Sequence, residues 1–481
     1  MRNVSKEIFL DSLVCPALGW MIRNDKISKT DTLGDKFRMW QGLEVHSRVR
    51  GLYPQGIFID EQNIDTAADI TTNLIEDPEA SVLFEATFIA DGYVAKTDIL
   101  QRLDDGWHII EVKSSVRDKP EFIDDMAYTT MIVEQFGLQI KKITLFLVSK
   151  EYRLGMDDNL LFVEVDHAFE VKSRVEEFRE FLGIIEEVTR SPEKPETVLR
   201  FECRKCKHFR ECLGKDMEHH IFDLPRLSQP KFNGLMGLDI ISIEDIPVDF
   251  ELTSFQERVR ECVQSGIIFV SGYLYDSLES IVWPVFYLDF ETMMTAIPLY
   301  PGIAPYTQIP TQYSIHVCSD VGEIIDHFEY LADPRRDCRR EFAENLIQNL
   351  QVDGSIVVYS NFEKTIINAL MAQFLDLTDG LSNIVSRLVD LEAIIKKNFY
   401  HPGFYGSTSI KNTLPALVPE MSYEDLAIMD GDTAMSVFAF MAIGKYTDTE
   451  AEIKKRDLLE YCKQDTLAMI YLHQRLHENI L

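Results

Sequence analysis

The stretch that decides the fold of the first part of the chain is SVLFEATFIADGYVAKTDILQRLDDGWHIIEVKS, residues 81–114. It contains three runs rich in aliphatic, aromatic and β-branched residues, separated by the dipeptides Asp91-Gly92 and Asp105-Gly106. Asp-Gly is favoured in tight hairpins because both central residues of a type I′ turn need a positive φ. The stretch therefore predicts a meander of three strands.

The segments around this meander extend it into an α/β layer. A helical start precedes it, a helical segment from Pro120 to Phe136 follows it, and the apolar run Ile143–Ser149 predicts one more strand. A second block of the same kind comes later. Its expected elements are the strands Val285–Glu291, Gln312–Cys318 and Glu323–Leu331, a helix near Arg336–Leu350 and the strand Ile356–Ser360. Both blocks are expected to be α/β layers with mixed sheets.

These patterns divide the 481 residues into three regions. Residues 1–214 hold the first block and end in a group of cysteines. Residues 215–282 are mostly helical and are expected to form a connector. Residues 283–481 hold the second block and close with a long helical pattern.

The charge limits the functions that the chain supports. The formal net charge is −31, with 46% hydrophobic and 26% charged residues, which is the composition of a folded globular protein. An acidic field of this size repels phosphate backbones at long range, so a nucleic-acid function requires local basic patches and bound cations. No run approaches the roughly 20 apolar residues of a membrane span, and no targeting segment is visible. We therefore expect a cytoplasmic protein that does not bind membranes.

The first candidate site lies on the second and third predicted strands. Glu111 and Lys113 are two residues apart and share a face, and the meander brings Asp98 alongside. Two carboxylates hold a hard divalent cation, and a lysine positions or helps to deprotonate an attacking water. His46, in a helical stretch upstream, is a candidate for a further ligand. From these residues alone, a solvated sheet face with a salt-bridged lysine is the alternative.

This order of a helical histidine, an aspartate and Glu-x-Lys resembles the PD-(D/E)xK nucleases of the RecB type. The resemblance implies a restriction-endonuclease-like fold, His46, Asp98 and Glu111 as ligands of Mg²⁺ or Mn²⁺, and Lys113 as a catalytic residue that acts on DNA. In that family the next helix often carries Gln-x3-Tyr.

Two further positions bear on this first resemblance. Tyr128 fits the tyrosine of that motif, whereas Asp124 stands at the glutamine position, which is a departure from the pattern. Glu85, on the first strand of the meander, is a candidate for an additional acidic residue.

Four cysteines form a second motif set. Cys15 lies near the N-terminus, and Cys203, Cys206 and Cys212 follow the first block. Four thiolates suit structural Zn²⁺ or a 4Fe–4S cluster, and their spacing alone favours zinc. The layout resembles that of iron–sulfur RecB-type members, the CRISPR adaptation nucleases and AddB subunits, in which one cysteine precedes the nuclease core and three follow it. The resemblance implies a 4Fe–4S cluster that joins the two ends of this region.

The second candidate site begins with Asp289 and Glu291 at the end of an apolar strand. The two acids share a face, and burying two like charges is costly unless a cation neutralises them. A solvent-facing edge strand is the alternative. Near the C-terminus, Tyr461 and Asp465 are four residues apart in a helical pattern and face the same way.

This combination resembles the DEDD exonucleases of the DnaQ-like group, in the tyrosine subclass, which have an RNase H-like fold. The resemblance implies that Asp289, Glu291 and Asp465 hold two divalent ions and that Tyr461 orients the attacking water. Glu363 is the expected fourth carboxylate, although the family usually has aspartate there, and Asp390 is the substitute.

Together the two resemblances imply a metal-dependent nuclease with a RecB-like site and a 3′–5′ exonuclease site. The substrate is expected to be nucleic acid, with DNA preferred. Two alternatives stay open: an inactive nuclease-fold scaffold that binds a protein partner, which the net charge and Glu363 favour, and an exonuclease that acts on RNA.

Overall fold

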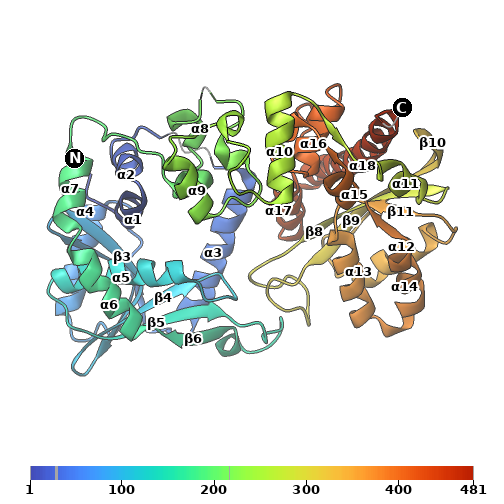
Figure 1. Ribbon diagram of the computed structural model, residues 1–481. Coiled ribbons are helices and arrows are strands. Elements are labelled where there is room, and N and C mark those ends of the chain that lie inside the picture. Colours follow the sequence, from blue (N-terminus) through green and yellow to red (C-terminus); the bar gives the residue numbers. More distant parts are fainter. Residues whose placement is uncertain (1, 28–30, 216, 480–481) are drawn as a thin grey trace. The chain divides into compact units, whose positions relative to one another are not determined.

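The computed structural model describes residues 2–27, 31–215 and 217–479. It divides into two compact units (Figure 1), each an α/β structure with a mixed sheet. The first unit comprises Met1–Val198 and Met294–Thr307, and the second comprises Leu199–Met293 and Gln308–Leu481. This division differs from the predicted regions, because residues 199–282 belong to the second unit and a short excursion after Met293 belongs to the first.

The first unit is built on a six-stranded sheet with the order β1-β2-β3-β4-β5-β6. β2, β3 and β4 pair antiparallel, which confirms the predicted meander, and β4 pairs parallel with β5. At the first turn Asp91 and Gly92 have φ values of 48° and 83°, the positive angles that a type I′ turn requires. The strands are β1 (Ile57–Phe58), β2 (Val82–Ala90), β3 (Tyr93–Leu103), β4 (Gly106–Lys113), β5 (Ile140–Val148) and β6 (Phe162–Asp166).

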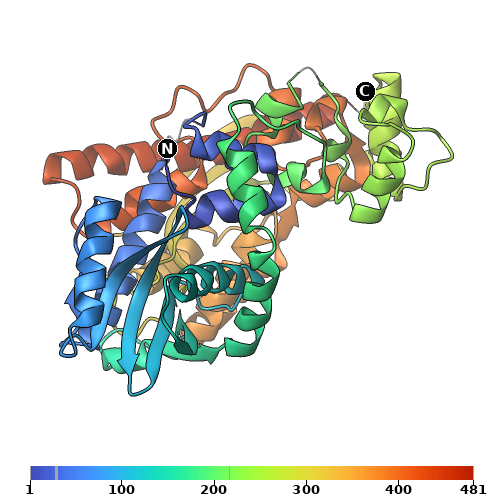
Figure 2. The same cartoon turned by 90° about the vertical axis from the view of Figure 1, so that its left-hand side faces the viewer.

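Helices cover this sheet (Figure 2). Successive residues of one strand enter different apolar clusters: Ile109 of β4 packs in a cluster with Met126 of α5, whereas Ile110 packs in a cluster with Val45 of α3 and with Ala296 of the excursion. The excursion is therefore part of the core of the first unit. The described helices here are α1 (Lys6–Val14), α2 (Pro16–Arg23), α3 (Leu33–Gly51), α4 (Ile64–Glu76), α5 (Pro120–Gln135), α6 (Ala168–Arg179) and α7 (Leu182–Arg190).

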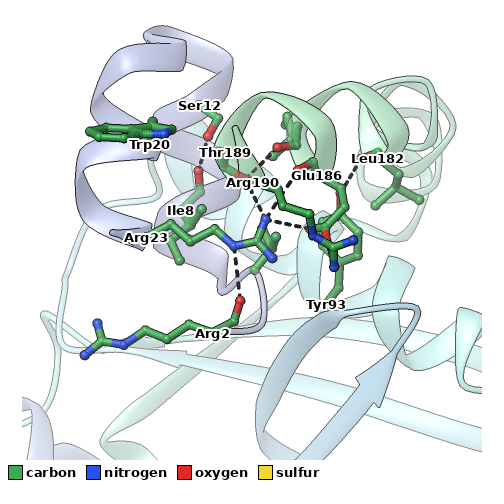
Figure 3. Close-up of polar contacts among 12 residues, drawn as sticks. Arg2, Ile8, Ser12, Trp20, Arg23, Tyr93, Leu182, Glu186, Thr189 and Arg190 are labelled. Carbon is green, nitrogen blue, oxygen red and sulfur yellow. Dashed lines mark hydrogen bonds and ion pairs between the residues drawn. The ribbon is translucent and has the colours of Figure 1, made fainter. Parts of the chain in front are cut away.

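A buried arginine holds the N-terminal helices to α7 (Figure 3). The side chain of Arg23, at the end of α2, is 2% exposed. Its Nη1 lies 2.7 Å from Oε2 of Glu186 and donates to Oγ1 of Thr189 at 2.8 Å. Its Nε donates to the carbonyl of Arg2 at 3.1 Å. The Arg23 clasp, as we call this group, therefore fixes both α2 and the chain that leads into α1.

The second unit contains a five-stranded sheet with the order β10-β9-β8-β11-β12. β8, β9 and β10 form the predicted antiparallel meander, and β11 and β12 add parallel strands on the other side of β8. β8 thus lies in the centre of the sheet, not at an edge. The strands are β8 (Val285–Met293), β9 (Ile309–Asp320), β10 (Glu323–Leu331), β11 (Ile356–Val358) and β12 (Leu388–Asp390), and β7 (Phe269–Val270) pairs separately with β13 (Phe399–Tyr400).

The two faces of this sheet also enter separate cores. Tyr287 packs in a cluster with Met469 of α18, whereas Leu288 packs with Phe342 of α12. Residues 199–282 contribute Leu235 to the first of these clusters, so the expected connector is part of the core of the second unit. The described helices are α8 (Phe209–Cys212), α9 (Gln229–Met236), α10 (Ser254–Ser265), α11 (Leu274–Glu279), α12 (Arg339–Asn349), α13 (Phe362–Gln373), α14 (Thr378–Ser386), α15 (Leu391–Asn398), α16 (Ile410–Leu417), α17 (Gly431–Ala442) and α18 (Asp448–Glu478).

The longest of these helices is α18, with 31 residues. It carries many charged side chains among its apolar ones. Across the described part of the chain, no helix is both long enough and apolar enough to span a membrane.

Candidate metal centres

The first site forms where the ladder between β3 and β4 opens. The last paired residues are Ile99 and Ile110, and beyond them the backbone N–H of Val112 donates to Oδ2 of Asp98 at 2.7 Å. On the neighbouring strand, Glu85 is left out of the pairing and has a φ of 60°. Such a left-handed conformation is uncommon for glutamate and is found at functional sites. Asp98 is also left out of this pairing, and the unchanged register on both sides of the gap places Asp98 and Glu85 opposite each other.

Three side chains converge at this opening. His46 of α3, Glu85 and Asp98 each offer a ligand atom, and these atoms lie within 4.8 Å of one another. Burial and the nearby Glu111 raise the pKa of Asp98 to about 7, because both oppose its negative charge. Burial acts against the charged form of His46, but Oε1 of Glu85, 3.8 Å from its Nδ1, and the adjacent carboxylates raise its pKa overall. The donor set suits a divalent cation.

Glu111 is near enough to affect the charge of Asp98, but it is not one of the three residues whose ligand atoms converge, and two lysines hold it. Its side chain is 3% exposed, and its Oε1 accepts from Nζ of Lys113 at 2.9 Å and from Nζ of Lys6 at 3.2 Å. The ammonium groups outweigh burial and lower the pKa of Glu111 to about 2. Its Oε2 is buried and has no hydrogen-bond partner among the described residues. A buried carboxylate oxygen without a donor fits a bound cation.

The helix after the meander does not present its tyrosine to a ligand. Tyr128 of α5 is fully buried, and its hydroxyl donates to the carbonyls of Val4 and Val94 at 2.7 and 3.0 Å. Asp124 accepts from Arg174 at 2.7 Å. The residue of α5 that reaches the site is Asp125, which accepts a hydrogen bond from Lys113.

The second site is centred on β8 and α18. Asp289, Glu291 and Asp465 each offer an oxygen, and these oxygens lie within 4.8 Å of one another. Burial and mutual repulsion raise the pKa values of Asp289 and Glu291 well above their usual range. The structure thus brings together three acids that the sequence predicted to share a site, and the central position of β8 rules out the edge-strand alternative.

Glu363 is a better candidate for the fourth metal-binding carboxylate than Asp390. Glu363 lies in the first turn of α13, is 3% exposed, and its Oε2 has no hydrogen-bond partner among the described residues. Burial is the main cause that raises its pKa to about 7, with repulsion from Asp390 and Asp465 adding to it. Asp390 instead caps α15, where its Oδ1 accepts from the N–H of Ala393 at 2.9 Å.

Two tyrosines flank Asp465. The hydroxyl of Tyr423 donates to Oδ1 of Asp465 at 2.5 Å, and Tyr461 lies one turn before Asp465 on α18. Burial raises the pKa of Asp465 to about 6, although hydrogen bonds from Tyr423 and Tyr461 oppose that rise. Burial and the same carboxylates raise the pKa of Tyr461, so its hydroxyl stays protonated and available as a donor.

The four cysteines are not among the groups of converging metal-ligand atoms found in the described residues. Cys203, Cys206 and Cys212 lie in the second unit and are half-buried, whereas Cys15 lies in the first unit between α1 and α2. None of the eight cysteines, all of them within the described residues, forms a disulfide. The only groups of three or more close metal-ligand atoms found among the described residues are the two described above. The cysteine-bound cluster or zinc therefore stays a prediction.

Several site residues were missed because no motif links them to the predicted ligands. Lys6 joins the first site from the start of α1 and Asp125 from within α5, whereas Tyr423 reaches the second site from a loop. Lys411, at the start of α16, exerts an electrostatic effect on Glu291 that favours the charged carboxylate. The positions of these residues in the sequence do not predict that they contact the sites.

Comparisons with known proteins match parts of this chain. A family model described as a domain of unknown function, DUF2779, matches residues 286–409, which include Asp289, Glu291 and Glu363 but not Asp465. Uncharacterized protein UU173 of Ureaplasma parvum serovar 3 is 24% identical over 257 residues, 49% of this chain and 37% of the relative. Uncharacterized protein MG366 of Mycoplasma genitalium is 29% identical over 210 residues, 38% of this chain and 30% of the relative. The chain thus spans well under half the length of either relative, and these relatives are described without a function.

Proposed function

We propose that the protein is a metal-dependent nuclease with two active sites, one in each unit. The observation that carries the proposal is the convergence of Asp289, Glu291 and Asp465, with Glu363 close by, in the centre of the second unit. Four clustered carboxylates are electrostatically unfavourable without cations, and two Mg²⁺ or Mn²⁺ ions would relieve that repulsion. Bound there, such ions would polarise a phosphate and promote ionisation of the attacking water.

The side chains of the chain supply the remaining functions of this site. The protonated hydroxyl of Tyr461 is a donor that orients a water, and Tyr423 holds Asp465 in place. Lys411 is an exposed cation near Glu291 and is suited to contact a backbone phosphate of the substrate. We propose an RNase H-like exonuclease that removes nucleotides from a 3′ end.

The first unit is proposed to be a PD-(D/E)xK nuclease. His46 and Asp98, with Glu85 beside them, would hold a divalent ion, Glu111 would join them as a further ligand, and Lys113 would position the water or the phosphate. The buried free oxygen of Glu111 supports this assignment. We further propose that the four cysteines hold a 4Fe–4S cluster or, as the alternative, zinc. Iron and sulfide analysis of anaerobically purified protein would separate the two.

The test is a cleavage assay with end-labelled single- and double-stranded DNA and RNA in Mg²⁺, Mn²⁺ or EDTA. Wild-type protein is compared with Asp289→Asn and Glu111→Gln, which remove one charge each at nearly constant volume. Stepwise shortening from the 3′ end that is lost in Asp289→Asn supports the exonuclease, and residual cleavage that is lost in Glu111→Gln supports the first site. A metal-loaded wild-type protein that cuts none of these substrates would refute the proposal and favour a partner-binding scaffold.

A further inference from the structure

Lys6 contacts the same carboxylate oxygen as the predicted catalytic lysine. Nζ of Lys6 lies 3.2 Å from Oε1 of Glu111, and Nζ of Lys113 lies 2.9 Å from that atom. The opposite oxygen, Oε2, has no hydrogen-bond partner among the described residues. The carboxylate is thus held through one oxygen and presents the other.

The two acidic partners of Lys113 suggest why a second lysine contacts Glu111. Lys113 also donates to Asp125, so its ammonium is shared between two acids. To contact a phosphate or a water, Lys113 must loosen at least one of these interactions. Lys6 keeps a positive charge beside Glu111 when Lys113 moves away, which lowers the electrostatic cost of that movement.

The position of Lys6 is fixed by the surrounding structure, so the contact does not depend on a mobile chain end. Lys6 begins α1, and Ser5 caps that helix by accepting from the N–H of Ile8. Just before it, the N–H of Val4 donates to the carbonyl of Gly92 at 2.9 Å. The Arg23 clasp ties the carbonyl of Arg2 to the same helical layer (Figure 3).

We propose that Lys6 is a positioning residue of the first site. It holds Oε1 of Glu111, leaves Oε2 to a divalent cation, and allows Lys113 to engage the substrate. This inference rests on the proposed nuclease function of the first site and extends it to the N-terminal helix, to which neither motif assigned a role.

The experiment separates cation binding from cleavage. Mn²⁺ binding is measured by calorimetry on the full-length chain in an Asp289→Asn, Glu291→Gln background, which weakens the second site. Lys6→Gln and Lys6→Met both remove the charge, and Lys6→Met keeps the apolar stem in case Lys6→Gln fails to fold. Lys6→Arg is the conservative variant, and Lys172→Gln, an exposed lysine of α6, is the matched control.

We expect the neutral variants to bind Mn²⁺ more tightly, by on the order of tenfold, because a positive charge beside Glu111 is removed. Their cleavage rate at saturating Mn²⁺ should nevertheless fall at least tenfold, since Lys113 stays bound to Glu111. Lys6→Arg should restore most of the rate, and Lys172→Gln should match wild type. A purely structural role would instead weaken cation binding and cleavage together.

Two outcomes overturn the inference: unchanged Mn²⁺ affinity, or weaker Mn²⁺ affinity, in a folded neutral variant. If the wild-type first site binds Mn²⁺ but cleaves no nucleic acid, the proposed nuclease function of that site fails. In that case the difference in Mn²⁺ affinity between wild type and Lys6→Met still decides whether Lys6 acts on Glu111.

Discussion

Replacing Glu363 by glutamine should stabilise the metal-free protein, although Glu363 is a candidate metal ligand. Its carboxylate is 3% exposed, and burial raises its pKa from 4.5 to about 7. The folded state therefore holds this proton to a higher pH than the unfolded state does. For an acid with a raised pKa, stability falls as the pH rises from the unfolded value through the folded one.

The magnitude follows from these two pKa values. At pH 7 the difference in proton binding costs the wild-type fold about 3 kcal/mol, and at pH 5 it costs less than about 1 kcal/mol. Glutamine has no charge to bury, and its carbonyl can accept from the N–H of Phe290, which contacts the glutamate in the wild type. We expect Glu363→Gln to gain about 2–3 kcal/mol at pH 7 in EDTA and to lose that advantage near pH 5.

Urea unfolding at pH 5, 6, 7 and 8 in EDTA, followed by fluorescence and circular dichroism, measures this difference. Glu329→Gln, an exposed glutamate of β10, is the matched control and should change stability little. Addition of Mn²⁺ should reverse the order, because only the wild type keeps all four carboxylates for the cations. A variant that is less stable than wild type at pH 7 in EDTA, or a difference independent of pH, would refute the electrostatic reasoning.

Three further predictions test other parts of the molecule. Mn²⁺ should raise the melting temperature of the wild type more than that of Asp289→Asn, Glu291→Gln, as differential scanning calorimetry will show; equal shifts would mean that the second site binds no cation. Arg23→Met should lower the free energy of unfolding, measured in urea, by about 3 kcal/mol, because it leaves the partly enclosed Glu186 with only Arg190 as partner. Arg190→Met, at the exposed end of the same group, should lower it by under about 1 kcal/mol. Similar losses in the two variants would contradict a buried clasp. Burial lowers the pKa of His316 from 6.5 to about 4, so the unfolded chain takes up this proton first as the pH falls, and stability is lost between these values. His316→Asn should therefore remove about 2 kcal/mol of the loss of stability between pH 7 and pH 5, and an unchanged pH dependence would contradict this assignment.

Local signals in the sequence were sufficient for the two meanders and for the pairing of acids within them. Asp-Gly turns fix where a chain reverses, and a two-residue spacing fixes which face Asp289 and Glu291 share. The four-residue spacing of Tyr461 and Asp465 likewise follows from helical geometry. These rules act over a few residues, so they could be applied before any contact was known.

The contributions that the sequence did not reveal all depend on long-range packing. Residues 215–282 resemble a linker in composition, yet Leu235 enters the core of the second unit. The positive φ of Glu85 has no glycine to signal it, and the interrupted pairing opposite Asp98 leaves the strand register unchanged. Lys6 lies 105 residues from Glu111 in sequence, and only the packing of α1 brings it to that site, while Asp125 reaches Lys113 from the helix that follows the strand.

The excursion after β8 has a consequence for how the chain can be divided. The polypeptide leaves the second unit directly after the strand that carries Asp289 and Glu291, and Ala296 donates from its N–H to Oε1 of Gln41 at 2.6 Å within the first unit. It then returns to form β9. A fragment ending at Val198 therefore lacks the strip that covers Val45, so the core of the first unit is incomplete, whereas a fragment starting at Leu199 keeps every residue of the second unit and carries that apolar strip without its partners. The dependence runs one way: the first unit needs a segment that lies between two strands of the second, so it cannot be exchanged as one contiguous cassette, whereas the second unit would be separated with an uncovered apolar loop.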